Sequence, residues 1–230
     1  ACHGSYARAL RITARDLFGL DEISDVTIHE LAEHVIADNT PGLYRRILQE
    51  RCGIRRSITC VEQVAFPNDP GLCGVSMIIW RLLDSPLAAG EGGLAEKAGI
   101  AIHSLDDAAV AMQTLARRDL QAGAVGFKLM IADYYPADAR AAEAAFEAAL
   151  RSPKPVQAVS AVRDYLLDKC LDVAAEADAS VAVHTGYWGD FRQFDPKNLL
   201  GVALHRRDVR FDLFHLGMPM IRDAQLIGKT

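Results

Sequence analysis

The sequence lacks the signatures of several large protein classes. Half of its 230 residues are hydrophobic, yet no apolar run approaches the roughly 20 residues of a membrane-spanning helix. No basic segment followed by an apolar one opens the chain as a secretory signal would. Lys and Arg number 25 against 30 Asp and Glu, and the resulting net charge of −5 gives no electrostatic footprint for nucleic acid or acidic membranes. We therefore expect a globular protein that binds neither nucleic acid nor membrane.

Cysteine is scarce, and nucleotide-binding glycine motifs are missing. The five cysteines are odd in number and include no CxxC pair, which suits reduced thiols in the cytoplasm rather than a disulfide framework. They are Cys2, Cys52, Cys60, Cys73 and Cys170. The glycine-rich stretch at residues 89–93 fits neither a Walker loop nor the dinucleotide fingerprint, which disfavours nucleotide binding.

From residue 54 onward, apolar runs alternate with helical patterns. Strands are predicted over residues 54–61, 75–80, 124–130, 180–184 and 209–215. Helices are predicted over 104–121, 136–151, 156–177 and 218–229, with a further helix opened by Asp195-Pro196. Continuous apolar runs separated by helices indicate an α/β fold with a parallel sheet buried on both faces.

Three predicted helices come before the first strand, over residues 5–20, 27–38 and 41–51. They interrupt the strict alternation of strands and helices. We therefore predict a helical insertion over residues 1–53 and a β/α part over residues 54–230, which together form one domain.

Two predicted strands end in a histidine followed by a glycine turn, at His184-Thr-Gly186 and His215-Leu-Gly217. The histidines are 215 − 184 = 31 residues apart, about one strand–helix–strand period. Parallel strands would place both imidazoles at the C-terminal edge of the sheet, where α/β enzymes carry their chemistry. Neutral imidazole is a good ligand for Zn²⁺ and also a general base near pH 7. The alternative is a pair of histidines that are hydrogen-bonded for structure alone.

Lys128 lies inside an otherwise apolar strand, Gly126-Phe-Lys-Leu-Met130. Because an unpaired buried ammonium is costly, something must satisfy it. A functional lysine here would anchor a substrate carboxylate or phosphate, become a carbamylated metal ligand, or act as a Schiff-base nucleophile. A structural lysine would extend its amine from the strand end to solvent.

The loop after His184 is rich in aromatic and charged residues. Loops at the C-terminal ends of barrel strands carry substrate contacts, so Tyr187, Trp188 and Arg192 are candidates for lining a pocket. Residues 133–135, which follow the strand of Lys128, belong to the same class. Packing within the loops is the alternative for both groups.

Four motifs in this order resemble the amidohydrolase superfamily, especially its uronate isomerase-like and decarboxylase-like branch. They are the N-terminal Gly4-Ser-Tyr-Ala-Arg-Ala-Leu10, Gly126-Phe-Lys128, His184-Thr-Gly186 and Phe214-His215-Leu-Gly217-Met-Pro219. The resemblance implies a (β/α)8 TIM-like barrel with a divalent metal, for which we expect zinc, at its C-terminal face. It implies that His184 is the fifth-strand metal ligand and His215 the sixth-strand ligand or substrate contact. Lys128 would lie on the fourth strand as a carbamylated or substrate-binding lysine.

The same resemblance makes the five predicted strands the second to sixth of eight. The family's first-strand His-x-His would precede Ala1, and its eighth-strand Asp would follow Thr230. As written, the barrel would be incomplete, so we expect a piece of a longer protein. The open sheet edges predict self-association into a homo-oligomer.

The leading functional expectation is a metal-dependent hydrolase that acts on a small carbonyl-containing substrate through metal-activated water. His184 would hold the metal, His215 would bind metal or substrate, and Lys128 would assist. Uronate isomerisation and non-oxidative decarboxylation are alternatives on the same fold. A lyase using Lys128 as a Schiff base and a non-catalytic, truncated barrel that serves as a binding module are further alternatives.

Overall fold

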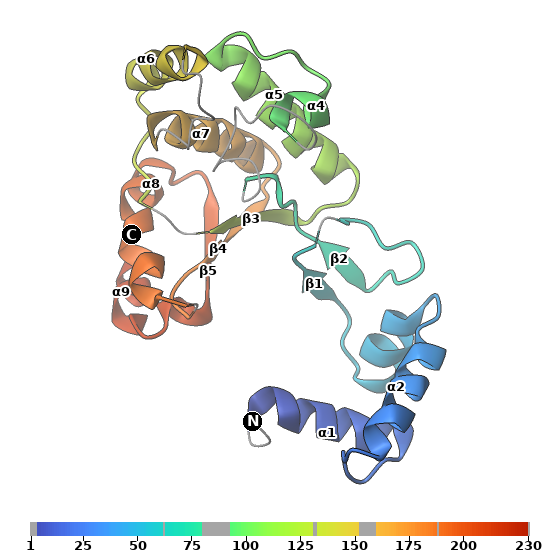
Figure 1. The fold of residues 1–230 in the computed structure, drawn as a ribbon. Coiled ribbons are helices and arrows are strands. Elements are labelled where there is room, and N and C mark those ends of the chain that lie inside the picture. Colours follow the sequence, from blue (N-terminus) through green and yellow to red (C-terminus); the bar gives the residue numbers. More distant parts are fainter. Residues whose placement is uncertain are drawn as a thin grey trace. The chain divides into compact units, whose positions relative to one another are not determined.

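The computed structural model describes residues 4–61, 63–79, 93–130, 133–151, 160–187 and 189–229. The chain forms two units (Figure 1). The first comprises Ala1–Ser57 and Pro67–Gly71, and the second comprises Ile58–Phe66 and Leu72–Thr230.

The first unit is helical. It contains α1 (Ser5–Phe18), α2 (Thr27–Asp38) and a π-helix (Arg45–Arg51), so helices are present in all three predicted places. Helix α1 ends at Gly19, whose φ of 70° is left-handed and suits a residue without a Cβ. The third helix differs from the expected α-helix because its hydrogen bonds span five residues, as in Cys52 N–H to the Ile47 carbonyl.

The second unit contains parallel strands that neighbour one another in chain order. Strands β3 (Gly126–Met130), β4 (Ser180–His184) and β5 (Arg210–Phe214) form one parallel sheet. Strands β1 (Ser57–Thr59) and β2 (Leu72–Gly74) form a second sheet. Ser76 joins the two sheets, because its N–H donates to the Gly126 carbonyl and its carbonyl accepts from the Lys128 N–H.

Sequential parallel strands with intervening helices are typical of repeated β/α units. The described ranges therefore show a mixed α/β fold with parallel sheets. Their strands do not close into a barrel, so the closure expected of a (β/α)8 fold is not confirmed by this part of the chain.

Helices cover one face of the β3–β4–β5 sheet. Figure 1 shows α4 (Leu94–Ala98), α5 (Leu105–Gln121), α6 (Ala139–Leu150) and α7 (Ser160–Glu176) gathered on one side of these strands. Two shorter helices, α8 (Leu200–His205) and α9 (Ile221–Ile227), flank β5 in the sequence. Single 3-10 turns lie at Phe191–Phe194, Pro196–Leu199 and His215–Gly217.

The two faces of this sheet differ in chemistry. Side chains alternate between faces along a strand, and the residues directed at the helices are fully buried and apolar. They are Phe127, Leu129, Val181 and Val183, and they join the hydrophobic core with residues of α5 and α7. The opposite face carries Lys128, His184 and Asp212, which places the polar side chains of the sheet together.

The strand predicted over residues 75–80 is wrong in its bounds. Strand β2 ends at Gly74, a single bridge remains at Ser76, and Ile78 and Ile79 are helical. A continuous apolar run indicates burial but does not distinguish a buried strand from a buried helix. Trp80, the last residue of the predicted strand, lies outside the described residues.

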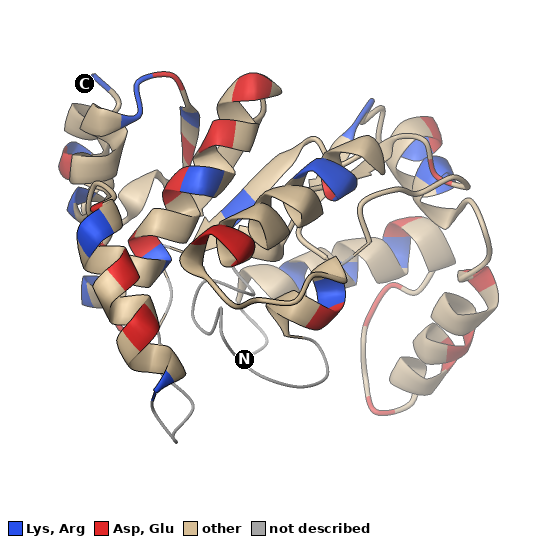
Figure 2. Cartoon of the chain, turned by 90° about the horizontal axis from the view of Figure 1, so that it is seen from above, with Lys and Arg blue, Asp and Glu red and all other residues tan. Residues whose placement is uncertain are grey.

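Charges of both signs are interspersed along the helices, as Figure 2 shows. This distribution matches the small net charge of −5. Within the described ranges, none of the helices has the length and apolar character needed to cross a membrane.

Candidate active site

The structure brings His184 and His215 together. His184 is the last residue of β4 and lies in register with Phe214, the last residue of β5. His215 is therefore the first residue after the neighbouring strand. The centroids of the two imidazole rings are 4.6 Å apart, and the ring planes are inclined by 61°. Two imidazoles at this separation can bind a common small ligand or ion.

The loops that carry these histidines contact each other closely. Gly186 has a φ of 65°, and a Cβ placed there would lie 2.6 Å from the Gly217 carbonyl carbon. Its N–H donates to the Phe194 carbonyl at 2.6 Å. Glycine is therefore required at position 186 both for the left-handed backbone and for the approach of the second loop.

His184 is held in a buried environment. The residue is 7% exposed, and its ring meets the Phe194 ring edge-on at a centroid distance of 5.5 Å. Burial lowers the pKa of His184, the charges of Lys128 and His215 lower it further, and a hydrogen bond with the Tyr187 backbone acts in the opposite direction. The ring is therefore neutral at pH 7, which is the form that binds a metal or accepts a proton.

Lys128 is buried beside the histidines. It is 4% exposed, and its Nζ has no hydrogen-bond partner among the described residues. The Nζ lies 4.4 Å from the centroid of the Phe214 ring, a cation–π contact. Burial lowers the pKa of Lys128, and the weaker influences of Cys60 and Asp212 oppose that change. A lowered pKa increases the fraction of neutral, nucleophilic amine.

Asp212 is a member of this face that the sequence reasoning missed. In the sheet register Lys128 pairs with Ala182, and Ala182 pairs with Asp212, so one row holds a lysine, a small residue and an exposed aspartate. The signal was available: Asp212 is a charged residue between two apolar residues in the strand that leads to His215, just as Lys128 is in its own strand.

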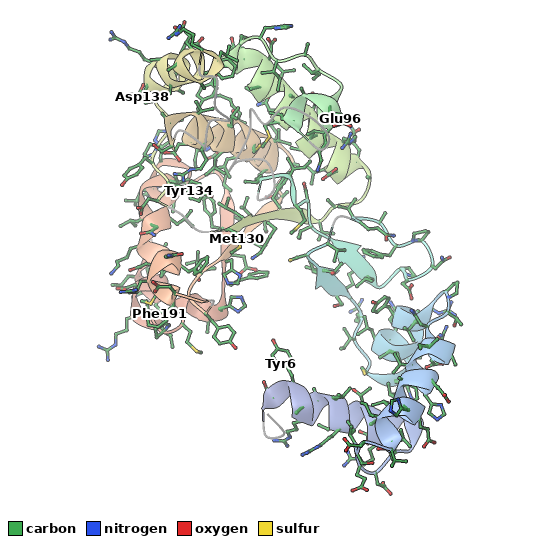
Figure 3. The ribbon with its side chains drawn as sticks, in the orientation of Figure 1. Tyr6, Glu96, Met130, Tyr134, Asp138 and Phe191 are labelled. Carbon is green, nitrogen blue, oxygen red and sulfur yellow. The ribbon has the colours of Figure 1, made fainter. Side chains whose placement is uncertain are left out.

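The loop after β4 gives a mixed result. Tyr187 is 63% exposed, and its ring centroid lies 6.1 Å from that of His215, which places it at the histidine pair. Arg192 is 81% exposed in its side chain and pairs with Asp190 at 2.6 Å. It lies in the same 3-10 turn as Phe191, which Figure 3 labels. Trp188 lies outside the described residues.

The segment after β3 packs inward. Tyr134 is 5% exposed, belongs to the hydrophobic core and donates a hydrogen bond to the Met130 carbonyl at 2.9 Å; both residues are labelled in Figure 3. The guanidinium of Arg163 lies 4.6 Å from its ring centroid. Tyr134 therefore stabilises the fold rather than lining an open pocket, whereas Tyr135 is 63% exposed.

The fit of these residues to a metal can be judged from their donor atoms. The histidine pair offers two nitrogen ligands, whereas a catalytic zinc takes about three protein ligands. Within the described ranges, no group of three or more His, Cys, Asp or Glu could hold a metal ion. The pair therefore fits a metal site if a further ligand comes from residues outside these ranges.

No protein-family model matches the sequence, and no curated protein matches it. Solved structures do resemble the fold. A protein from Lactobacillus casei ATCC 334, provisionally assigned as a metal-dependent hydrolase, matches with a TM-score of 0.57 and 14% identity over 81% of this chain. Uronate isomerase from Thermotoga maritima matches with a TM-score of 0.60 and 15% identity over 89% of this chain. Glucuronate isomerase from Caulobacter crescentus matches with a TM-score of 0.62 and 13% identity over 89% of this chain.

The chain spans about half the length of each of these structures: 51%, 53% and 50%. At 13–15% identity the likeness is one of fold. It agrees with the mixed α/β architecture.

Proposed function

We propose that the chain carries part of the active site of a metal-dependent hydrolase of the amidohydrolase type, built on a (β/α)8 barrel. The observation that carries this proposal is the pair of imidazoles, His184 and His215, 4.6 Å apart at the ends of adjacent parallel strands. The similar structures, a protein provisionally assigned as a metal-dependent hydrolase, a uronate isomerase and a glucuronate isomerase, add support.

In this proposal His184 and His215 hold a divalent metal, zinc, together with ligands from outside the described residues. When bound, such an ion lowers the pKa of a coordinated water and polarises a carbonyl group. The neutral ring of His184 suits a ligand, while the exposed ring of His215 can serve as a ligand or contact the substrate. Lys128, Tyr187, Trp188 and Arg192 are the proposed substrate contacts.

The metal content of the full natural chain tests this proposal. Purified wild-type protein should retain about one equivalent of metal per chain, as a catalytic site does, and His184→Ala should lose it. His205→Ala is the matched control, because that histidine is exposed at the end of α8 and belongs to neither of the two strand ends that carry the pair. Circular dichroism would confirm that all three proteins are folded. A folded wild-type protein that takes up no metal would rule the proposal out.

Sugar-acid isomerisation is the second candidate, favoured because two of the similar structures are a uronate and a glucuronate isomerase. Cationic groups such as Lys128 and Arg192 suit a substrate carboxylate. Turnover should be compared for uronates, amides, lactones and aromatic acids with the metal-loaded protein. Conversion of uronates alone would favour the isomerase, and hydrolysis of amides or lactones would favour the hydrolase.

A further inference from the structure

The backbone that carries His215 is strained. His215, Leu216 and Gly217 have φ values of 64°, 53° and 64°, so three consecutive residues are left-handed. Only the glycine adopts this conformation without a steric penalty from its side chain. Such a turn persists only where its surroundings hold it, and strained backbone of this kind clusters at functional sites.

One buried hydroxyl group holds both ends of this turn. The Thr185 Oγ1 donates to the Phe214 carbonyl at 2.6 Å and accepts from the Gly217 N–H at 3.1 Å. Phe214 precedes His215, and Gly217 follows Leu216, so the two hydrogen bonds bracket the two strained non-glycine residues. Thr185 is fully buried, so no water competes for these bonds.

The position of Thr185 in the chain links these two hydrogen bonds to the other histidine, His184. Thr185 directly follows His184 at the end of β4. The hydroxyl therefore connects the residue after one imidazole to the turn that presents the other. The two glycine loops also touch at Gly186 and Gly217, which leaves little freedom for the turn to shift.

We infer that Thr185 is a positioning residue that sets the separation of the His184 and His215 rings by holding the left-handed turn. It acts through the histidines and not on a substrate. Its effect on metal binding rests on the proposed function, whereas its effect on ring separation does not. A valine of similar shape removes both hydrogen bonds, and a serine keeps the hydroxyl.

The test uses the full natural chain and its Thr185→Val and Thr185→Ser variants. Calorimetric titration with Zn²⁺ should show at least about tenfold weaker binding for Thr185→Val, as for other residues that orient metal ligands. Thr185→Ser should bind Zn²⁺ close to wild type. Ser104→Ala, which removes the cap of α5 far from the histidines in the sequence, should keep wild-type affinity despite lower stability.

A second measurement needs no metal. Nuclear Overhauser contacts between the ring protons of His184 and His215 should be present in metal-free wild type and Thr185→Ser, and weakened or lost in Thr185→Val. Wild-type affinity together with intact ring contacts in Thr185→Val would overturn the inference. If wild type itself binds no Zn²⁺, the proposed function fails, and the ring contacts alone still decide the role of Thr185.

A folding failure of Thr185→Val can be separated from loss of position. The double variant Thr185→Val/Leu216→Gly relieves the left-handed strain at Leu216 but does not restore the bracket. It should fold yet still lack the ring contacts. Normal ring contacts in this double variant would overturn the inference.

Discussion

Two glycines of the loop after β4 differ in the space around them, so an alanine should destabilise the protein by different amounts at the two positions. Both Gly186 and Gly189 have positive φ, at 65° and 42°. A Cβ at Gly186 would collide with the Gly217 loop, whereas one at Gly189 would meet no atom within 4 Å. Gly189→Ala should cost about 1–2 kcal/mol for its backbone conformation, and Gly186→Ala about 3–5 kcal/mol because overpacking is added. Urea unfolding measures both, and equal losses would contradict the prediction.

Lys128 gives a second residue-scale prediction, one that depends on pH. Its amine is buried without a hydrogen-bond partner in the described part of the chain, so Lys128→Met should raise the free energy of unfolding by about 1–3 kcal/mol at pH 7. Burial lowers the folded-state pKa of Lys128 below 10.5. Between the folded-state pKa and 10.5, the unfolded chain binds more protons, so wild-type stability rises with pH.

The advantage of the methionine variant should therefore be largest at neutral pH and shrink toward pH 10.5. Thermal unfolding at a series of pH values measures this difference. Lys97→Met provides the control, because Lys97 is exposed on α4 and its replacement should change stability little at any pH. A Lys128→Met protein that is less stable than wild type would show that the amine has a stabilising partner. An advantage that does not vary with pH would show that the buried charge is not its cause.

At the scale of elements, Arg206 ties α7 to the segment between α8 and β5. It is 8% exposed and pairs with Asp168 at 2.8 Å, Asp172 at 3.0 Å and Asp208 at 2.9 Å. Arg206→Met should lower the free energy of unfolding by about 2–4 kcal/mol at pH 7. It removes the buried cation between three carboxylates, and only Asp168 and Asp172 keep another cation, Lys169. Arg192→Met, which removes an exposed pair with Asp190, should cost less than about 1 kcal/mol.

The pH dependence of the Arg206 variant has a definite sign. A hydrogen bond from Arg206 lowers the pKa of Asp208. The stabilisation is therefore present above the unfolded-state pKa and is lost as pH falls through the lower folded-state value. Wild type should lose this contribution in acid, and Arg206→Met should have little of it to lose. Parallel acid-unfolding curves for the two proteins would contradict this.

Sequence patterns predicted the helices and strands well where the apolar pattern agrees with residues that cap or end an element. Helix α5 begins after Ser104, whose side chain accepts from the Asp107 N–H, and β4 ends at His184 as expected. The patterns failed where an apolar run allowed either structure, as at Ile78 and Ile79. The π-helix at Arg45–Arg51 could not be predicted, because its local sequence also suits an α-helix.

The candidate site also contains residues that the sequence predicted and one that it did not. The spacing of His184 and His215 predicted neighbouring strand ends, since a β/α unit has a nearly constant length. Thr185 was not recognised, because a threonine after a strand gives no sign that its hydroxyl bridges Phe214 and Gly217. Its role depends on the left-handed turn at His215 and Leu216, which the sequence pattern does not predict.

At the scale of the whole molecule, the chain covers about half of each similar structure. Strands β3, β4 and β5 neighbour one another in chain order. The face of this sheet opposite the helices and the strand ends next to it carry the histidine pair, a buried lysine and an aspartate. In the proposed function this arrangement is part of the active site, and the proposed metal needs at least one further ligand. The central claim is thus that His184 and His215 share one ion.

A crystal of the full natural chain grown with Zn²⁺, with data collected at the zinc absorption edge, tests this claim most directly. We predict one anomalous peak about 2.0–2.1 Å from a ring nitrogen of both His184 and His215. Well-ordered imidazoles with no shared anomalous peak would contradict it.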